Sequence, residues 1–99
     1  MRSSFLLTTY RVLLSQTAVN QLSRIDSKQV TRVKDAMRKL RDDPFRSRPG
    51  ADIRKLRLKS SPSLFRLRVG NYRVIYFVLN DEVRVTEIIH RSRGYSWLE

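Results

Sequence analysis

Alternating apolar and polar residues predict strands throughout the second half of the chain. In the run 64–69, Phe65, Leu67 and Val69 fall on one face of a strand and two arginines fall on the other. Short breaks rich in serine, proline, glycine and asparagine separate this run from its neighbours, as turns between antiparallel strands do. The pattern predicts four hairpin-linked strands, at residues 53–58, 64–69, 72–79 and 83–90.

The first half of the chain predicts one strand followed by two helices. The run 10–15 has the length and composition of a strand, and Ser15 or Thr17 can cap a helix that follows it. Asp26 begins a capping-box pattern that ends at Gln29. Apolar residues recur at helical spacing on both sides of this pattern, at Ala18, Leu22 and Ile25 in the first helix and at Val30, Val33, Met37 and Leu40 in the second.

The order of these elements predicts the fold class. Two helices follow the first strand, residues 44–52 form a loop with two prolines and a glycine, and no helix separates the last four strands. This order is typical of an α+β protein, in which a two-helix hairpin packs on one face of a twisted, largely antiparallel sheet of about four to five strands. We expect a single domain over residues 1–99, with residues 1–9 as an N-terminal extension.

Composition narrows the class of protein. The 99 residues carry a formal net charge of +12, and 40% of them are hydrophobic, which is enough for a folded core. With no cysteine and one histidine, we expect no disulfide, no metal site and no cofactor. The longest uncharged stretches, 12–23 and 74–80, are too short to span a membrane. The N-terminus begins like a signal peptide, but Arg11 interrupts its apolar run, so we expect a cytoplasmic protein.

The positive charge is concentrated in one part of the chain. Residues 44–73 hold nine basic side chains and a single acid, Asp52. Charged outer faces are ordinary in two-layer proteins, so a solvated basic face is one interpretation. The other is a binding site for a polyanion such as a nucleic-acid backbone, because the planar guanidinium of arginine binds phosphate oxygens in pairs.

A predicted hairpin turn favours the second interpretation. Gly70 and Asn71 have the order of a two-residue type II′ turn. This turn would place Arg68 directly opposite Arg73 on the open face of the sheet, beside Arg66. Like charges placed across a strand pair are destabilising, so we expect these three arginines to face a phosphate group.

The last strand leads into a segment with candidate catalytic groups. Residues 90–97 include the only histidine, two arginines, a tyrosine and the only tryptophan. His90 can exchange a proton near neutral pH, and Arg91 can stabilise a pentavalent phosphorane. Tyr95 can stack on a base or donate a hydrogen bond. A lone histidine at a strand end is also commonly a packed or surface residue.

Two segments resemble the signature of the RelE/ParE toxin superfamily. The first is Phe-Arg-Leu-Arg-Val-Gly-Asn-Tyr-Arg-Val-Ile-Tyr at 65–76, and the second is His-Arg-Ser-Arg-Gly-Tyr at 90–95. The upstream strand, two helices and leucine-rich strand at 55–58 agree with the superfamily order. The resemblance implies a RelE-like fold and the toxin of a type II toxin–antitoxin system.

The resemblance also implies an activity. RelE-like members cleave messenger RNA on the ribosome and inhibit translation as metal-independent endoribonucleases, in which a 2′-hydroxyl attacks the adjacent phosphate. At matching positions, Arg73 would clamp the phosphate, Arg91 would stabilise the transition state, and Tyr95 would be a further functional residue. We expect the surrounding basic residues to bind RNA, at Arg66, Arg68, Lys55, Arg57 and Lys59.

The chain departs from well-studied ribonuclease members at the position of the general base. Those members carry lysines where this chain has Arg66 and Arg68, and an arginine does not deprotonate in a protein. His90 is therefore the first candidate for the base, followed by Tyr95 and then Glu87.

Two other functions share these features. A ParE-like toxin with the same fold acts on DNA gyrase, and a catalytically silent module would use its arginines only to bind nucleic acid or an antitoxin. We expect the partners to be messenger RNA, the ribosome and an acidic cognate antitoxin with an amphipathic helix, because such a helix complements a chain with a net charge of +12.

Overall fold

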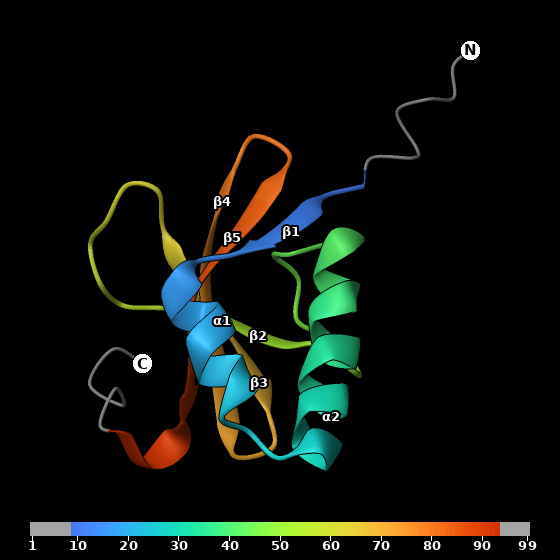
Figure 1. The fold of residues 1–99 in the computed structure, drawn as a ribbon. Coiled ribbons are helices and arrows are strands. Elements are labelled where there is room, and N and C mark those ends of the chain that lie inside the picture. Colours follow the sequence, from blue (N-terminus) through green and yellow to red (C-terminus); the bar gives the residue numbers. More distant parts are fainter. Residues whose placement is uncertain (1–8, 94–99) are drawn as a thin grey trace.

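The computed structural model describes residues 9–93 (Figure 1). Tyr95 and most of the expected N-terminal extension lie outside the described residues. No helix within residues 9–93 has the length and apolar character needed to cross a membrane. The elements, in chain order, are β1 (Arg11–Leu14), α1 (Gln16–Ser23), α2 (Ser27–Arg38), the 3-10 helix η2 (Lys39–Arg41), β2 (Asp52–Lys55), β3 (Leu64–Val69), β4 (Tyr72–Leu79), β5 (Glu82–His90) and the 3-10 helix η3 (Arg91–Arg93).

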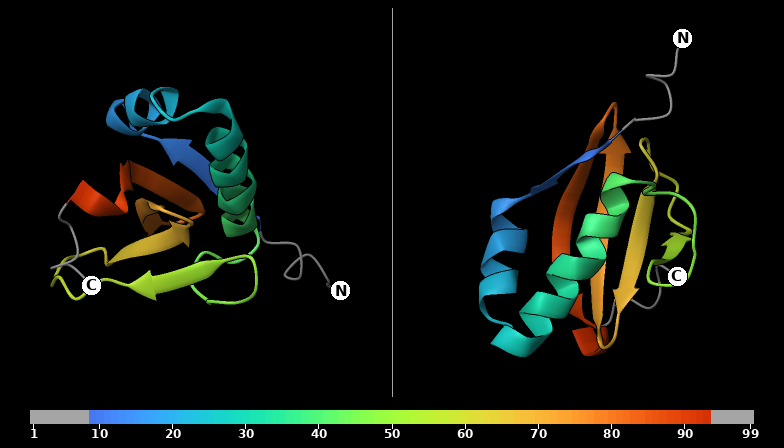
Figure 2. Two further views of the ribbon diagram at one scale, coloured as in Figure 1. Left: turned by 90° about the horizontal axis from the view of Figure 1, so that it is seen from below. Right: turned by 90° about the vertical axis from the view of Figure 1, so that its right-hand side faces the viewer.

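The strands form one five-stranded sheet in the order β1-β5-β4-β3-β2. β1 pairs parallel to β5, and all other neighbours pair antiparallel. Figure 2 shows α1 and α2 together on one face of this sheet, and within the described residues no α-helix covers the other face. The predicted α+β fold, with a helical hairpin on one face of a largely antiparallel sheet, is confirmed.

Each α-helix begins at a polar side chain that accepts a hydrogen bond from its first turn. The hydroxyl of Ser15 accepts from the N–H of Ala18 at 3.0 Å, and a carboxylate oxygen of Asp26 accepts from the N–H of Gln29 at 3.1 Å. These bonds satisfy backbone donors that the first turn of a helix leaves unpaired. Ser15, rather than Thr17, is therefore the cap of α1.

The main core lies between the helices and the sheet. Val33 and Leu40 from the helical layer and Leu67 and Tyr76 from the strands are fully buried. The hydroxyl of Tyr76 donates to the carbonyl of Pro44 at 2.7 Å, which ties the loop after η2 to β4. Burial raises the pKa of Tyr76 well above its usual value, so the hydroxyl keeps the proton that it donates.

A second, smaller apolar cluster lies on the opposite face of the sheet. Leu56 and Ile75 are buried there, and Leu64 and Ile89 pack against them. The alternation of residues in β3 predicts a cationic face on this side. The structure instead shows a face that combines apolar and basic side chains.

β2 is shorter than the strand predicted at 53–58. It ends at Lys55, and the next residue, Leu56, is buried and donates its N–H to the carbonyl of Leu64 at 2.9 Å. The chain leaves the sheet only after Leu56. Arg57 and Lys59 consequently lie in an exposed loop and not in a strand.

Candidate functional site

The β3–β4 hairpin pairs Arg68 with Arg73, as the sequence predicts. Gly70 has a φ of +57°, and Asn71, the second residue of the turn, is not among the residues with positive φ. A positive φ at the first turn residue alone is the type II′ form. The predicted turn and its register are confirmed.

Four arginines from the adjacent strands β2, β3 and β4 lie on the face of the sheet away from the helices. Arg11 of β1 and Arg84 of β5 also lie on this face, where both are bonded to Glu82. Arg66 and Arg68 come from β3 and Arg73 from β4, and β2 adds Arg54 directly opposite Arg66. We call these four residues the arginine face. Sequence reasoning missed Arg54 because a long loop joins β2 to β3, and such a loop does not fix the register as a two-residue turn does.

The four arginines differ in exposure, which corrects the prediction of an open patch. Arg68 and Arg54 are exposed, whereas Arg66 retains 4% and Arg73 8% of their accessible surface. One terminal nitrogen (Nη1) of Arg66 donates to the backbone carbonyl of Asp52 at 2.9 Å and to its carboxylate at 3.0 Å. Asp52, the single acid of residues 44–73, therefore balances the positive charge of Arg66 within the chain.

Arg73 is fixed by the hairpin turn that precedes it. Its Nη1 donates to the carbonyl of Gly70 at 2.9 Å and to that of Tyr72 at 3.0 Å. Its Nε is buried without a hydrogen-bond partner. An unpaired buried donor costs about 1–3 kcal/mol, so an anion that accepted a bond from Nε would recover part of this energy.

A β-bulge in β5 decides which face His90 occupies. Thr86 has no partner on β4, because the register of the pairing shifts there, and a residue inserted in this way moves the following side chains to the opposite face. Strict alternation from Val85, which is in the main core, would turn His90 toward the arginine face. With the bulge, His90 lies across from Tyr72, and the two rings meet edge to face at 5.3 Å. Since Tyr72 packs on the main core, the structure does not bring His90 together with Arg73.

The same bulge turns Glu87 toward the side of the sheet that carries the arginine face, opposite Ile75. Its carboxylate accepts a hydrogen bond from Nε2 of Gln21 in α1 at 3.3 Å. The amide oxygen of Gln21 accepts the N–H of Ile88 at 2.6 Å, so the main chain fixes the orientation of this amide. Helix α1 thereby orients the carboxylate of Glu87.

Arg91 begins η3, directly after β5. Its N–H donates to the carbonyl of Asn71 at 2.7 Å, which joins the end of β5 to the β3–β4 turn. Its side chain is exposed. Arg91 is therefore held by its backbone next to the hairpin that carries Arg68 and Arg73.

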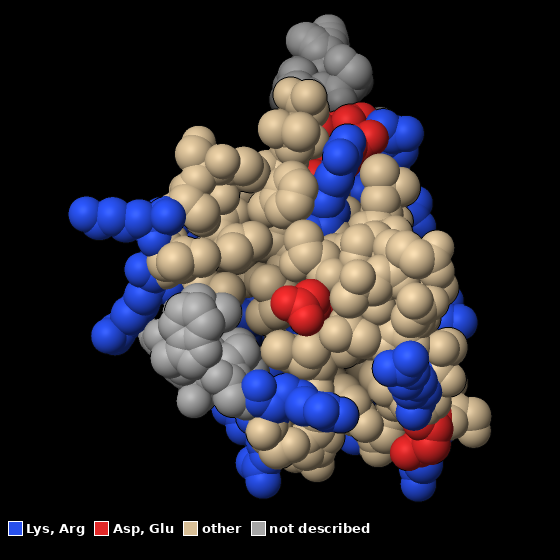
Figure 3. All heavy atoms as spheres, turned by 60° about the vertical axis from the view of Figure 1, so that its left-hand side comes forward, with Lys and Arg blue, Asp and Glu red and all other residues tan. Residues whose placement is uncertain are grey.

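The other predicted RNA-binding residues, Lys55, Arg57 and Lys59, are exposed at the end of β2 and in the loop after it. In Figure 3, lysine and arginine side chains project around the margin of the molecule, while the middle of this view is mainly uncharged. Exposed cations at a margin attract a polyanion over long range.

The sequence matches a toxin family over most of its length. Residues 12–95 match the family described as the ParE toxin of the type II toxin–antitoxin system parDE. The chain belongs to this family, within the RelE/ParE superfamily of type II toxins. Among curated proteins, none matches the chain significantly.

Three solved structures that match this fold are toxin–antitoxin complexes. The archaeal RelE-RelB complex from Pyrococcus horikoshii OT3 contains a chain that is 28% identical, with a TM-score of 0.72 over 87% of this chain and 99% of that one. The RelB-RelE complex from Methanococcus jannaschii matches at 23% identity and a TM-score of 0.68, over 88% of this chain and 99% of that one. The RelBE2 complex from Mycobacterium tuberculosis matches at 23% identity and a TM-score of 0.67, over 84% and 99%. The last two show likeness of fold alone.

Proposed function

We propose that this toxin is a ribosome-dependent endoribonuclease that cleaves messenger RNA and inhibits translation. The observation that carries the proposal is the arginine face, with Arg91 held beside its hairpin. Four guanidinium groups on a sheet face that no α-helix of residues 9–93 covers suit a phosphodiester better than they suit an uncharged ligand. The likeness to a chain of the archaeal RelE-RelB complex supports this choice.

In the proposed reaction, a 2′-hydroxyl attacks the adjacent phosphate and the 5′-oxygen leaves. Negative charge develops on the phosphate oxygens, and donors that are already in position stabilise it most effectively. Two backbone carbonyls hold Arg73 in one orientation, so it acts as the phosphate clamp, and Arg91 stabilises the transition state. Arg68 and Arg54 bind flanking phosphates, and Arg66 supports the face through its bonds to Asp52.

Proton transfer requires other groups, because arginine stays charged. Among the carboxylates that the described strands carry on this side of the sheet, Asp52 is bonded to Arg66 and Glu82 to Arg11 and Arg84. Within residues 9–93, Glu87 is bonded to no arginine, so it is the first candidate. Tyr95 is the second candidate. Positioning of the RNA by the ribosome lowers the demand on either group, since alignment alone contributes several kcal/mol.

The match to the ParE family favours a second candidate function, inhibition of DNA gyrase. Such a toxin needs a surface that binds the enzyme and no reacting phosphate. Loss of a single arginine of the site should therefore abolish most RNA cleavage, whereas inhibition of gyrase does not require any arginine to act on a reacting phosphate.

A cell-free translation assay tests the proposal. Purified toxin is added to an extract that translates a defined message, and primer extension maps the cuts. Arg91→Ala is the informative variant because its side chain is exposed and its backbone bond to Asn71 is kept. We expect it to cleave about 10²–10³-fold more slowly, as for the loss of one preorganised donor. Arg24→Ala, an exposed arginine of the helical layer, is the matched control and should cleave like the wild type.

The alternatives give different results in the same preparation. Breaks in DNA that require gyrase, with an intact message, would support the second function and overturn the first. An intact message and intact DNA would overturn both. Cleavage that is unchanged in Arg91→Ala would remove the proposed role of that residue.

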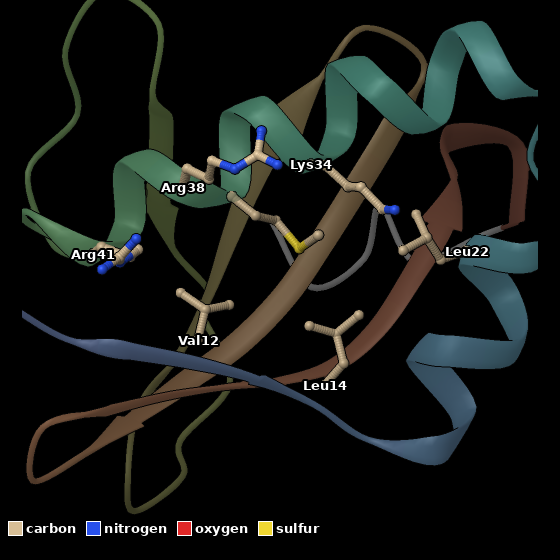
Figure 4. A pocket seen from close by; sticks show the side chains of 7 residues that line it. Val12, Leu14, Leu22, Lys34, Arg38 and Arg41 are labelled. Atoms are coloured by element: carbon tan, nitrogen blue, oxygen red, sulfur yellow. The ribbon is translucent and has the colours of Figure 1, made fainter.

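We also propose that a cognate antitoxin binds the helical side of the molecule. A groove between β1, α1 and α2 has an apolar floor that includes Val12, Leu14 and Met37. Figure 4 shows Lys34, Arg38 and Arg41 along its rim. An acidic amphipathic helix complements both features. The solved structure that contains a chain 28% identical to this one is a complex of RelE with RelB, which supports a partner of this kind.

A further inference from the structure

His90 makes contacts that suit a structural task rather than contact with RNA. Its ring meets that of Tyr72 edge to face, with an interplanar angle of 90°. Arg73 pairs with the preceding residue, Ile89, so its side chain and that of His90 leave the sheet on opposite faces. A group on the far face of the sheet cannot take a proton from a ribose that is bound at the arginine face.

The hydrogen bonds of His90 determine which ring nitrogen carries the proton. The backbone N–H of Ser92 donates to Nδ1 of His90 at 3.2 Å. An amide N–H can only donate, so Nδ1 accepts with its lone pair and the proton of the neutral ring lies on Nε2. The hydroxyl of Ser92, at 2.8 Å from the same nitrogen, is then also a donor to it. Nδ1 is thus fully occupied within the chain.

The bond from Ser92 has the geometry of a familiar turn. A side-chain acceptor that binds the N–H two residues later is the arrangement that asparagine makes through Oδ1 in an Asx-turn. Here the ring nitrogen of His90 takes the place of that oxygen, at the point where η3 begins. The N–H of Arg91 is bonded to Asn71 at the same point. Two successive amides are therefore fixed.

We propose that His90 is a positioning residue, which holds the turn that presents Arg91 and does not exchange a proton with the substrate. This inference rests on the proposed function for its effect on cleavage. The structural part of the inference, that His90 holds the turn, does not depend on any activity of the protein.

Two amide variants separate positioning from proton transfer. His90→Asn keeps an acceptor at the place of Nδ1 and has no counterpart of Nε2. His90→Gln places its amide nearer to Nε2 and loses the acceptor for Ser92. If His90 positions Arg91, His90→Asn should cleave within about threefold of the wild type and His90→Gln about 10–100-fold more slowly, because small misplacements of a reacting group have effects of this size.

The pH dependence of cleavage gives a readout that a positioning role leaves unchanged. His90→Asn should keep both limbs of the wild-type pH–rate profile. If instead His90→Asn and His90→Gln are equally slow and one limb disappears, His90 transfers a proton and the inference is overturned.

Hydrogen exchange separates failure of this inference from failure of the proposed function. In an inactive protein, the amide of Ser92 should still exchange faster in His90→Gln than in the wild type, and His90→Asn should restore its protection. Exchange at Ser92 that is the same in all three proteins would overturn the inference, whether or not the wild type cleaves RNA.

Discussion

The two buried residues of the arginine face have their partners within the chain. Arg66 is bonded to Asp52, and Arg73 is bonded to two carbonyls of the turn. These bonds offset part of the cost of placing arginines across a strand pair, so a bound polyanion is not needed to explain the register. Affinity for the phosphates that flank the reacting one then rests on the exposed members, Arg54 and Arg68, beside the proposed roles of Arg73 and Arg91 at the reacting phosphate.

This difference predicts that loss of Arg66 lowers the free energy of unfolding more than loss of Arg68 does. Arg66→Ala should lower the free energy of unfolding by about 1–3 kcal/mol, because Asp52 loses its charged partner and a buried side chain is removed. Half of the Asp52 side chain is exposed, so solvent screens this pair and the loss falls in the lower part of that range. Arg68→Ala should change the free energy of unfolding by less than about 0.5 kcal/mol, as substitutions of exposed residues usually do.

Urea unfolding of the two variants and the wild type measures this difference. Binding of a single-stranded RNA provides the complementary readout, in which Arg68→Ala should be the weaker binder. Equal losses of stability would mean that Arg66 is not held as described.

Among the elements, the β3–β4 hairpin organises the site. Its turn carbonyls hold Arg73, and the carbonyl of Asn71 accepts the N–H of Arg91. The turn depends on a backbone conformation at Gly70 that other residues rarely adopt.

Gly70→Ala should therefore lower the free energy of unfolding by about 1–3 kcal/mol, from backbone strain at positive φ. Steric crowding adds little, since an added methyl group would meet the flexible end of Arg32 at 3.4 Å. Asn71→Ala, next to it without a positive φ, is the matched control and should change stability much less. Thermal or urea unfolding tests the pair, and similar losses in both variants would contradict the assigned turn.

For the whole molecule, the net charge of +12 governs how fast acidic partners arrive. Charge acting at long range does not depend strongly on where a cation lies, whereas contact within a groove does. Substitutions in the groove between β1 and the helices can therefore distinguish long-range attraction of the antitoxin from direct contact with it.

Two double variants with the same loss of charge make this distinction. Lys34→Gln with Arg41→Gln alters the groove rim, and Arg24→Gln with Lys28→Gln removes two exposed cations elsewhere in the helical layer. Both pairs should slow association with the cognate antitoxin at low salt. Only the groove pair should also speed dissociation, by about tenfold, because it loses close contacts. Surface-bound antitoxin and measured rate constants test this, and equal dissociation rates would remove the groove from the interface.

Sequence patterns predicted much of this architecture because they are local. Helix caps at Ser15 and Asp26 and the turn at Gly70 depend on neighbouring residues, and the turn alone fixed the pairing of Arg68 with Arg73. Features that depend on distant partners were missed. They include the place of Arg54 opposite Arg66, and the burial of Arg66 and Arg73.

The face of the sheet that His90 occupies could not be predicted from the sequence for a different reason. Alternation along a strand is a reliable guide only while every residue has a partner, and one unpaired residue, Thr86, inverts it. No residue type marks that place, since threonine is common in regular strands.

The unpaired Thr86 also has a consequence for how such a protein can diverge. Loss of Thr86 would leave Val85 opposite Tyr76 and Glu87 opposite Ile75, so the side chains at the end of β5 would keep their faces. Pairing of Thr86 with Ile75 at the same chain length would close the bulge and exchange the two sets of side chains. Related chains could in this way present either Glu87 or His90 toward the arginines without new secondary structure. A change in strand register, at constant chain length, would then alter the chemistry available at that surface.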